Sequence, residues 1–386
     1  MNKKSIHRAD IDLGAPLQWD IYDINNQLLL RKGYVLQTEH QLEALLERGL
    51  FVDPQEYHQR RTEKHEQAPR QRPRLPSVVR LINQTKEQLE PLMHGILTGS
   101  ALAATPELIL AAAKAVIAAV ELNPDIALAW IVFAPKTEGG YALRHCVEAA
   151  IIALLVAEGM KKSADELIQI TAAALTMNVG MLSLQERLQG KAEALSDEES
   201  ALIKQHPRIS VELLRMAGVK ETHWLNNVMF HHENLDGSGY PFGRSGKEIP
   251  ENAQIISLAD RYTARIAPRT YRKGILPHEA LRGLLIEGGK TLEPLIAAYF
   301  IRTLGVYPPG AIVRLQNGET AVIYKRGKSG TTPIALSVLG PRGAPLEQPV
   351  RRETGDELHG IREAIALDPG EIPFSMEVLW GKEAAP

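Results

Sequence analysis

Apolar residues recur with a helical period through the middle of the chain, over positions 77–305. The stretch 101–132 is rich in Ala, Leu and Ile, and the stretch 147–160 is apolar enough to form a buried helix. Ser196 begins a capping box, and Pro207 predicts that the helix ends there or that another begins. The pattern therefore predicts about eight helices packed in one bundle-like domain.

Strand-like patterns precede the helical segment. Leu28–Leu30 follows the turn-like pair Asn25-Asn26, which predicts a hairpin. Thr38 is placed to cap a helix that runs to Glu47, and Gly49 is a natural stop after it. We interpret residues 1–56 as a small N-terminal α+β module.

Strand-like patterns also follow the helical segment. Residues 310–315 and 320–324 flank the turn Asn317-Gly318, which predicts a second hairpin. Residues 334–339 predict a third strand. Residues 306–386 are therefore expected to form a small, barrel-like, β-rich C-terminal extension.

The stretch 57–76 is polar, charged and rich in proline. Such a composition cannot bury a core, so we interpret it as a linker. Its arginines could contact an anionic partner, but a solvated linker is the commoner case for this composition. The chain as a whole is thus predicted to be mainly α, with its helical domain over 77–305.

Composition and charge exclude several classes of protein. Hydrophobic residues make up 44% and charged residues 23% of the chain, as in ordinary soluble domains. The formal net charge of −2 argues against a DNA-binding protein or a polybasic membrane binder. No apolar run reaches ~18 residues and no secretory signal is recognisable, so no membrane span is expected and the cytoplasm is the expected location. The single cysteine, Cys146, excludes an internal disulfide and cysteine-based zinc knuckles.

The most informative chemistry is a pair of adjacent histidines, His231 and His232, followed by a glycine-rich turn. Neutral imidazoles are good ligands for Mn, Fe, Ni and Zn, so the pair could serve one metal site. A surface histidine pair capped by a tight turn explains the same residues, and the pattern alone does not decide between the two. His145, His206 and Asp260 could join the pair in a histidine-rich pocket with one carboxylate.

A longer pattern surrounds these histidines. It consists of His231-His232-Glu233, Asp236-Gly237-Ser238-Gly239-Tyr240-Pro241, Ile249-Pro250, Ala259-Asp260 and Tyr271-Arg272. The pattern resembles the HD-GYP family, whose helical domains are metal-dependent phosphodiesterases that hydrolyse cyclic di-GMP. The resemblance covers about 140–305. It extends to the tail, where residues 307–310 and 317–319 look like the usual extension, and to the N-terminal module, which is similar to the small domain that often precedes such domains.

The resemblance implies a helical HD-type domain and assigns roles to individual positions. The family's metal-binding residues fall on His145, His206, His231, His232 and Asp260. The turn that shapes the loop on the substrate or partner side falls on Asp236, Gly237, Gly239, Tyr240 and Pro241.

The sequence departs from the family at its name-giving dyad. Met177 and Asn178 stand where the family has His and Asp, Met181 replaces a lysine, and Gln185 and Thr263 replace a proline and a later aspartate. A bridging aspartate offsets the repulsion of two metal ions ~3.5–4 Å apart, which the neutral Asn178 cannot do well. The thioether of Met177 is a poor ligand for Mn or Fe(II), and Met181 cannot neutralise a phosphate.

Two functions are the leading candidates at this point, ahead of a phosphohydrolase with a different substrate or a purely structural role. One is a degenerate HD-GYP protein that binds cyclic di-GMP, a related nucleotide or a signalling partner such as a diguanylate cyclase domain without cutting the nucleotide. The other is an active phosphodiesterase with a mononuclear site of three histidines. The expected cofactor is one transition metal (Mn, Fe or Ni), with no metal as the alternative.

Overall fold

The computed structural model describes residues 3–6, 11, 17, 19–34, 36, 39–46, 50–54, 76–134, 140–268, 274–327 and 330–386. The chain divides into two compact units, Met1–Arg74 and Leu75–Pro386. Thr38, Glu47, Gly49 and Tyr271-Arg272, which carried expectations above, lie outside the described residues.

In its described residues the first unit has a four-stranded sheet and the helix α1 (Glu39–Leu46). Its strands lie in the order β1 (Lys4–Ser5), β4 (Phe51–Val52), β2 (Ile21–Tyr22) and β3 (Leu28–Leu30). β2 and β3 pair antiparallel, which confirms the hairpin predicted from the turn between them. The unit has a small core of its own, formed by Ile6, Ile11, Leu17, Ile21, Leu36, Leu42, Leu50 and Val52.

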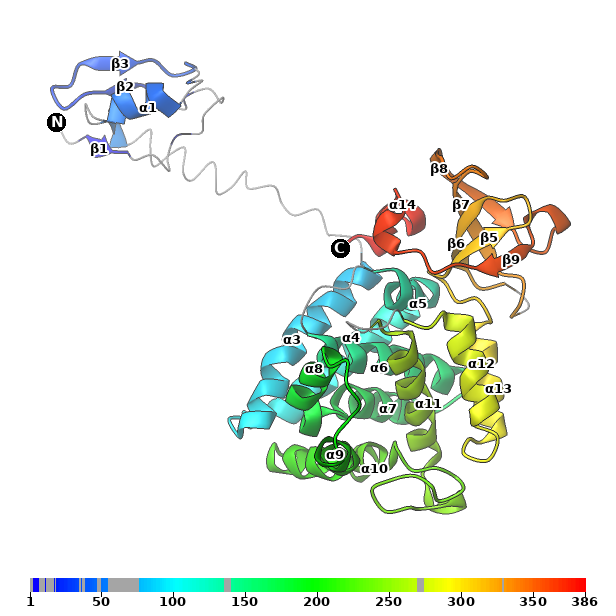
Figure 1. The fold of residues 1–386 in the computed structure, drawn as a ribbon. Helices are drawn as coiled ribbons and strands as arrows, with labels where there is room; N and C mark the ends of the chain where they lie inside the picture. Colours follow the sequence, from blue (N-terminus) through cyan, green and yellow to red (C-terminus); the bar gives the residue numbers. More distant parts are fainter. Residues whose placement is uncertain are drawn as a thin grey trace. The chain divides into compact units, whose positions relative to one another are not determined.

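The second unit is mainly helical, as predicted (Figure 1). Its helices before the C-terminal sheet are α3 (Val78–Thr98), α4 (Thr105–Leu122), α5 (Pro124–Phe133), α6 (Tyr141–Gly159), α7 (Ala164–Thr176), α8 (Leu182–Gln189), α9 (Asp197–Met216), α10 (Thr222–Phe230), α11 (Glu251–Ile266), α12 (Pro277–Glu287) and α13 (Pro294–Leu304). Within the described ranges this makes eleven α-helices rather than about eight. The longer apolar stretches are divided by short caps, such as Asn123, which ends α4 and begins α5.

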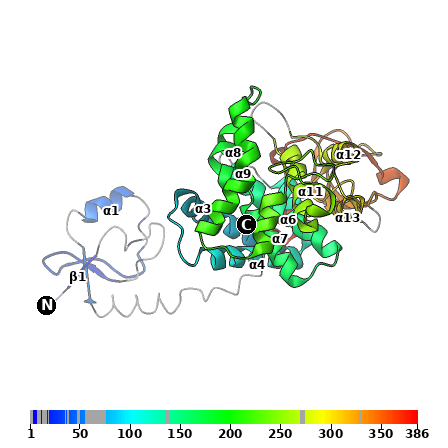
Figure 2. The same cartoon turned by 90° about the horizontal axis from the view of Figure 1, so that it is seen from below.

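Helix α6 is the centre of the helical part. It is buried from Ala142 to Ala157 apart from Arg144, and it packs against α7 and α11. Figures 1 and 2 show these three helices side by side. The buried helix predicted over 147–160 is confirmed, but α6 begins at Tyr141, so that His145 also lies in it, about one turn from its start.

Helix α9 corrects the expectation about Pro207. The capping box at Ser196 and Glu199 is present and starts the helix as predicted. The helix then passes through Pro207 without interruption as far as Met216. The prediction of a helix boundary at Pro207 was therefore wrong, and the local reason lies in the neighbouring His206, described below.

The C-terminal part is a five-stranded antiparallel sheet. Its strands lie in the order β8 (Pro345–Glu353), β7 (Ile334–Leu339), β6 (Thr320–Lys325), β5 (Ile312–Leu315) and β9 (Ile361–Ala364). The hairpin at Asn317-Gly318 and the third strand are confirmed. Among the described strands β8 and β9 do not pair with each other, so the sheet is open rather than a closed barrel.

The sheet and the last helix, α14 (Met376–Trp380), are fixed to the helices by specific contacts. The guanidinium of Arg326 donates to Asp125 at 2.6 Å and to the carbonyl of Thr303 at 2.9 Å. The indole N–H of Trp380 donates to the carbonyl of Tyr324 at 2.8 Å, and its ring contacts Phe133 edge-on.

One stretch of helix, Ala164–Gln189, is long and apolar enough to cross a membrane by length and composition alone. It includes α7 and α8, and 61% of its apolar 18-residue window is buried inside the structure. The α4–α5 pair meets the same test together but is bent by 107°. Core helices of globular domains commonly meet this test, and the burial of 164–189 fits that case.

Candidate metal centre

Three histidines from two helices meet in the interior of the second unit. His206 lies in α9, and His231 and His232 follow directly after α10. One ring nitrogen from each lies within 4.8 Å of the other two. His206 and His231 are completely buried, while the side chain of His232 is 15% exposed.

The orientation of His206 follows from the proline after it. Pro207 has no N–H, so the carbonyl of Ile203, four residues earlier, receives no helical hydrogen bond from it. The Nδ1 atom of His206 lies 2.6 Å from this carbonyl oxygen. A carbonyl only accepts, so Nδ1 carries the proton and the Nε2 lone pair of the neutral ring is left for a ligand.

The ring of His231 is oriented in the same way, by a backbone carbonyl in the last turn of α10. Its Nδ1 lies 2.7 Å from the carbonyl oxygen of Val228, one of the last carbonyls of α10. Carbonyls in the last turn of a helix have no partner within the helix, so this one is free to accept. The Nε2 of His231 is therefore also a bare lone pair.

The two lone pairs face each other. The Nε2 atoms of His206 and His231 are 3.2 Å apart, and both act as acceptors in the tautomers that the backbone fixes. Two acceptors at this distance repel each other unless a proton or a cation lies between them. The two imidazole lone pairs thus fit a transition-metal ion, for which neutral imidazole is the usual protein ligand.

The protonation state agrees with a ligand role. Burial, reinforced by the neighbouring His231, lowers the pKa of His206 to about 3. Burial also lowers the pKa of His231 and lowers that of His232 well below its ordinary value. All three rings are therefore neutral near pH 7 and available to a metal.

His145 and Asp260 lie beside the cluster but bind each other. The Nε2 of His145 is 2.7 Å from Oδ1 of Asp260, and Nε2 of His232 is 3.8 Å from Oδ2. Burial alone would raise the pKa of Asp260, but the hydrogen bond from His145 and the nearby imidazoles hold it below its usual range. The hydroxyl of Thr263 lies 3.2 Å from Nδ1 of His145, so both ring nitrogens have partners within the protein.

Met177 and Asn178 are the two residues at which the sequence resemblance expects a His-Asp dyad. Both are fully buried just after α7. The amide of Asn178 donates to Oε1 of Gln185 at 3.3 Å, whereas its own Oδ1 is buried with no hydrogen-bond partner among the described residues. Burial and the charge of Asp260 raise the pKa of nearby Cys146 to about 12, so its thiol stays protonated.

Ser210 fastens this stretch to the helix that carries His206. Its hydroxyl donates to the carbonyl of Met177 at 2.8 Å and accepts from the N–H of Gly180 at 2.9 Å. A Cβ on Gly180 would lie 2.7 Å from the backbone nitrogen of Ser210. Gly180 thus permits the close approach of α9. Met181, the residue after Gly180, is only half-buried, whereas Val179 before it is fully buried.

The loop after His232 is held from inside by Glu233. Its carboxylate is buried and accepts from the backbone N–H groups of Phe242 at 2.7 Å and Arg244 at 2.8 Å. The chain crosses itself at Gly239, where a Cβ would lie 2.4 Å from the Cα of Glu233. The loop therefore needs glycine there for packing, and it places the ring of Tyr240 in a stack on His232 with centroids 4.6 Å apart.

The remaining predicted loop residues make contacts within the loop or shape its backbone. Asp236 accepts from the N–H and hydroxyl of Ser238 and forms an isolated β-bridge with Ser245. Gly237 has a positive φ of 81°, which favours glycine at this turn. The peptide between Tyr240 and Pro241 is cis.

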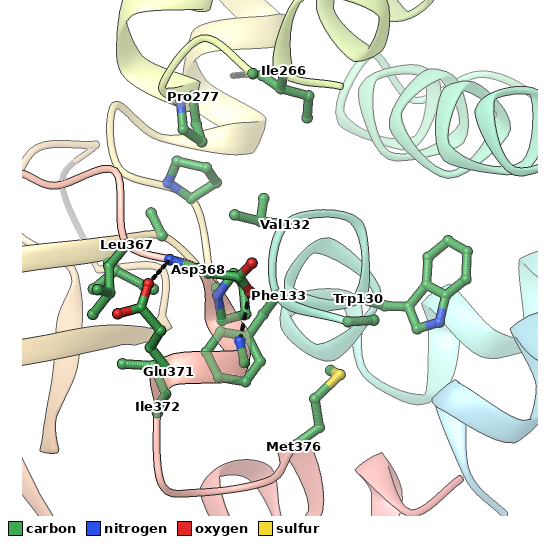
Figure 3. Close-up of a pocket in the computed structure, with 18 of the residues that line it drawn as sticks. Trp130, Val132, Phe133, Ile266, Pro277, Leu367, Asp368, Glu371, Ile372 and Met376 are labelled. Carbon is green, nitrogen blue, oxygen red and sulfur yellow. Dashed lines mark hydrogen bonds between the residues drawn. The ribbon is translucent and has the colours of Figure 1, made fainter. Parts of the chain in front are cut away.

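A large cavity lies apart from the three imidazoles. It has a volume of about 1530 Å³, and none of the three clustered histidines lines it. Figure 3 shows its mostly apolar walls, with Trp130, Val132 and Phe133 on the α5 side and Leu367, Ile372 and Met376 on the C-terminal tail. The size of a cavity is therefore no guide to the metal centre in this molecule.

The structure brings the side chains of His206, His231 and His232 together in one cluster. The side chains of Asp260 and His145 lie beside this cluster. Sequence reasoning missed the roles of Ser210, Glu233 and Ile203. The signal for Ile203 was available, since a proline inside a helix always leaves the carbonyl four residues earlier without its partner. No sequence signal marks the serine.

Comparison with known proteins places the site in context. Residues 138–294 match the model of a family described as an HD domain. A cyclic di-GMP phosphodiesterase of Pseudomonas aeruginosa is 28% identical over 217 residues, which cover 56% of this chain and 52% of that protein. The cyclic di-GMP phosphodiesterase response regulator RpfG of Xanthomonas campestris is 33% identical over 146 residues, 37% of this chain and 38% of that protein.

A 3'3'-cGAMP-specific phosphodiesterase of Vibrio cholerae is 28% identical over 178 residues, covering 44% of this chain and 36% of that protein. The chain thus spans about half the length, or less, of these relatives. Among solved structures, a HDG"Y"P protein from Bdellovibrio bacteriovorus matches with a TM-score of 0.50 and 18% identity, over 78% of this chain and 98% of that one. This last likeness shows a shared fold.

Proposed function

We propose that this chain, whose residues 138–294 match an HD domain and which resembles the HD-GYP family, is a cyclic di-GMP signalling protein that binds the nucleotide, or a signalling partner, and hydrolyses the nucleotide weakly or not at all. The observation that carries the proposal is the facing pair of imidazole lone pairs at 3.2 Å, together with a buried amide, Asn178, at the position where the resemblance expects a bridging carboxylate. The first feature supports a bound ion, and the second opposes a two-metal site.

The proposed ligands of the ion are His206, His231 and His232, with Asp260 adjoining. HD-domain phosphodiesterases are metal-dependent, and in such a site a bound ion polarises a phosphate oxygen and acidifies water. His206 and His231 would hold the ion through Nε2, with their Nδ1 protons fixed by backbone carbonyls. Metal-ligating histidines are usually oriented by such hydrogen bonds.

The proposal of weak turnover rests on the other half of the site. A second ion would need His145, Asp260 and a bridging anion. His145 and Asp260 are bound to each other, Thr263 occupies the other nitrogen of His145, and Asn178 carries no charge. Without a bridge, two cations are not held at the short spacing that two-metal hydrolysis requires.

An active phosphodiesterase with a single ion is the second candidate. Three neutral imidazoles leave open positions on a metal for water and a phosphodiester. The names of the relatives, which include cyclic di-GMP and 3'3'-cGAMP phosphodiesterases, favour it. The nucleotide is therefore proposed only as far as a cyclic purine dinucleotide, with cyclic di-GMP tested first.

The deciding experiment is a time course of cyclic di-GMP with the purified chain and added Mn or Fe(II), read by chromatography. The His231→Ala/His232→Ala variant is the control, and bound metal is counted in both proteins. We expect about one ion per native chain, little or none in the variant, and nucleotide binding without appreciable product. Product that disappears in the variant would establish the single-ion phosphodiesterase instead, and absence of both metal and nucleotide binding would reject both candidates.

Restoring the dyad tests the assignment of the altered positions. The triple variant Met177→His, Asn178→Asp, Met181→Lys should raise metal content from about one ion towards two and create or increase turnover. The carboxylate would replace an amide whose Oδ1 is already buried without a partner, so the space for a ligand atom exists. The single Met181→Lys variant is the matched control, because it adds the charge but no ligand. Unchanged metal content in a folded triple variant would contradict the assignment.

A further inference from the structure

The candidate metal centre is closed in this structure. The side chains of His206 and His231 are completely buried, and those of His145 and Asp260 are almost so. Of the five predicted ligand residues His232 is the most exposed, with 15% of its side chain accessible. A nucleotide therefore cannot reach the facing Nε2 atoms unless a neighbouring element moves.

Most elements around the centre are fixed by buried side chains. Helices α6, α7, α9, α10 and α11 each contain at least four buried residues. The glycine-rich loop is held by the buried carboxylate of Glu233, which accepts two backbone N–H groups. Displacement of any of these elements would expose apolar surface or take the partners from a buried charge, and both are costly.

Helix α8 differs from these elements. All eight of its residues, Leu182–Gln189, are described, and none of them is fully buried. Of its three leucines, only Leu182 at its start packs against the main hydrophobic core. A helix with so little buried apolar surface can open locally while the rest of the unit stays folded.

Two side-chain hydrogen bonds hold α8 across the end of the bundle nearest the centre. The carboxylate of Glu186 accepts from the backbone N–H of Ala142 at 2.6 Å, in the first turn of α6. The amide of Gln189 donates to the carbonyl of Pro268 at 2.6 Å, just after the end of α11. Since a helix rises about 1.5 Å per residue, Ala142 lies only about 5 Å along α6 from His145. Helix α8 thus spans the ends of two helices that carry residues of the centre.

A third contact reaches the altered dyad itself. Oε1 of Gln185 accepts from the side-chain amide of the fully buried Asn178 at 3.3 Å. The start of α8 follows directly on residues 179–181, whereas its end leads into residues 190–195, which are mostly exposed. This connection allows the end at Gln189 to move away while Leu182 stays packed.

We propose that α8 is a movable lid over the metal centre, and that the nucleotide reaches the imidazoles when Glu186 and Gln189 release their backbone partners. The inference rests on the proposed function, because it concerns access to the same site. Its test needs neither metal nor nucleotide, so a chain that binds neither would reject the function without deciding about the lid.

The test measures how readily diethyl pyrocarbonate, a reagent for neutral imidazoles, reaches His206 and His231 in the full chain without added metal. Rates are read by peptide mass spectrometry on singly modified chains, with the exposed His94 of α3 as the internal reference. Both buried rings should react at least about a hundredfold more slowly than His94, at a rate that low urea concentrations leave unchanged. Reaction as fast as that of His94, or a rate that rises with urea in parallel with global unfolding, would overturn the proposal.

The matched variants each change two side chains of α8. Glu186→Ala with Gln189→Ala removes both contacts to the helix ends, and Ser183→Ala with Arg187→Ala, at exposed positions of the same helix, is the control. The first variant should speed modification of both buried histidines at least about tenfold, while the control matches the native chain. Equal rates in the first variant and the native chain would contradict the lid.

Hydrogen exchange in the native chain decides if the first variant does not fold. The amides of α8 should exchange at least about tenfold faster than those of α6 and α9, through an opening that low urea concentrations do not promote. Amides of α8 that are as well protected as those of α6 would show that the helix does not open separately, and would overturn the proposal.

Discussion

At His206 and His231 the backbone, rather than another side chain, decides which ring nitrogen is left for a ligand. Each Nδ1 proton is fixed by a carbonyl that the helix itself does not use, one freed by Pro207 and one at the end of α10. The arrangement explains why a histidine followed by a proline inside a helix is useful at such a site. The proline creates the acceptor that orients the ring before it.

Substitution of the proline tests this account directly. In Pro207→Ala the new N–H competes for the carbonyl of Ile203, so His206 loses its fixed orientation while the helix gains a hydrogen bond. We expect metal affinity to fall by about 10–100-fold, the usual cost of losing an orienting partner, with no loss of stability. Affinity is measured by competition with a chelator.

Pro91→Ala is the matched control, because Pro91 also lies inside a helix, α3, but on its exposed side. It should leave metal affinity unchanged. Equal metal affinity in the Pro207→Ala variant and the native chain would show that the orientation of His206 does not depend on the freed carbonyl.

The candidate residues could be chosen from sequence because their types and spacing are specific. His206, His231 and His232 do lie together, whereas their distances to His145 and the pairing of His145 with Asp260 could not be foreseen. That pairing depends on how α6 and α11 pack, which no local pattern encodes. For the same reason the contact between Ser210 and Met177 was invisible in the sequence.

At the scale of elements, the glycine-rich loop is held by one buried carboxylate from within and by contacts of Asn234 with Arg261 and of Leu235 with Thr291. The carboxylate of Glu233 accepts hydrogen bonds from two backbone N–H groups in the second half of the loop, those of Phe242 and Arg244. These hydrogen bonds to Glu233 help to fix the conformation of the Gly-Tyr-Pro segment, which lies between the bonded residues. Tyr240 is positioned on His232 as a result.

Removal of that carboxylate should open the loop. In Glu233→Ala two backbone N–H groups lose a charged acceptor, which should cost about 2–3 kcal/mol. We expect hydrogen exchange at the amides of Phe242 and Arg244 to accelerate about 30–150-fold, which corresponds to that energy. Glu279→Ala, at an exposed position of α12, is the control and should leave both amides protected. Retained protection in the Glu233 variant would show that the loop is held by other contacts.

The C-terminal sheet has a buried ion pair that should make its stability sensitive to acid. Glu319 accepts two hydrogen bonds from Arg352, at 2.7 and 2.8 Å, and one from Ser337. The hydrogen bonds from Arg352 lower the pKa of Glu319 from 4.5 to about 2. Since the folded-state pKa lies below the unfolded one, the stabilisation is complete above pH 4.5 and is lost as the pH falls towards 2.

We expect the free energy of unfolding of the second unit to fall by a few kcal/mol across this range, part of it from this pair. The measurement is urea unfolding at a series of pH values, followed by hydrogen exchange in β6 and β7. In Arg352→Met the acid step should be smaller, because the main cause of the low pKa is gone. An acid step of the same size in the variant and the native chain would assign it to other groups.

The elements themselves could be predicted where local chemistry marks them. The capping box at Ser196, the turn at Asn317-Gly318 and the buried helix over 147–160 are all present. The boundary predicted at Pro207 failed because a side chain, rather than a chain break, uses the carbonyl that the proline leaves free. One of the helices missed in the count arises because Asn123 ends α4 and caps α5 without a loop between them.

At the scale of the molecule, every side chain of the metal centre comes from the second unit. The first unit has its own core, and the helical part joins the sheet through Arg326 and Asp125. We propose that residues 57–76 link the module at 1–56 to the helical domain at 77–305, with 306–386 as its extension. The mainly α architecture was predictable from periodicity, but the packing of the sheet on the helices was not.

This division predicts that a chain beginning at residue 75 keeps its metal. It retains Ser77, which caps α3 and accepts from the N–H of Arg80 at 3.3 Å. We expect metal content and nucleotide affinity within about twofold of those of the full chain, since no candidate ligand is removed. Both are measured on the two proteins side by side, and a clear loss in the shorter one would show that the N-terminal module takes part in binding.

The tail of the second unit returns to the start of its first helix. The hydroxyl of Ser77 donates to the carbonyl of Ala385, and the guanidinium of Arg80 donates to that of Pro386 at 3.2 Å. Because positions 77 and 386 are within reach of a few residues of peptide, the unit is suited to circular permutation. New termini opened in the exposed turn Pro341–Gly343 would leave every strand and helix whole, and the N-terminal module could then be carried from a different side of the molecule.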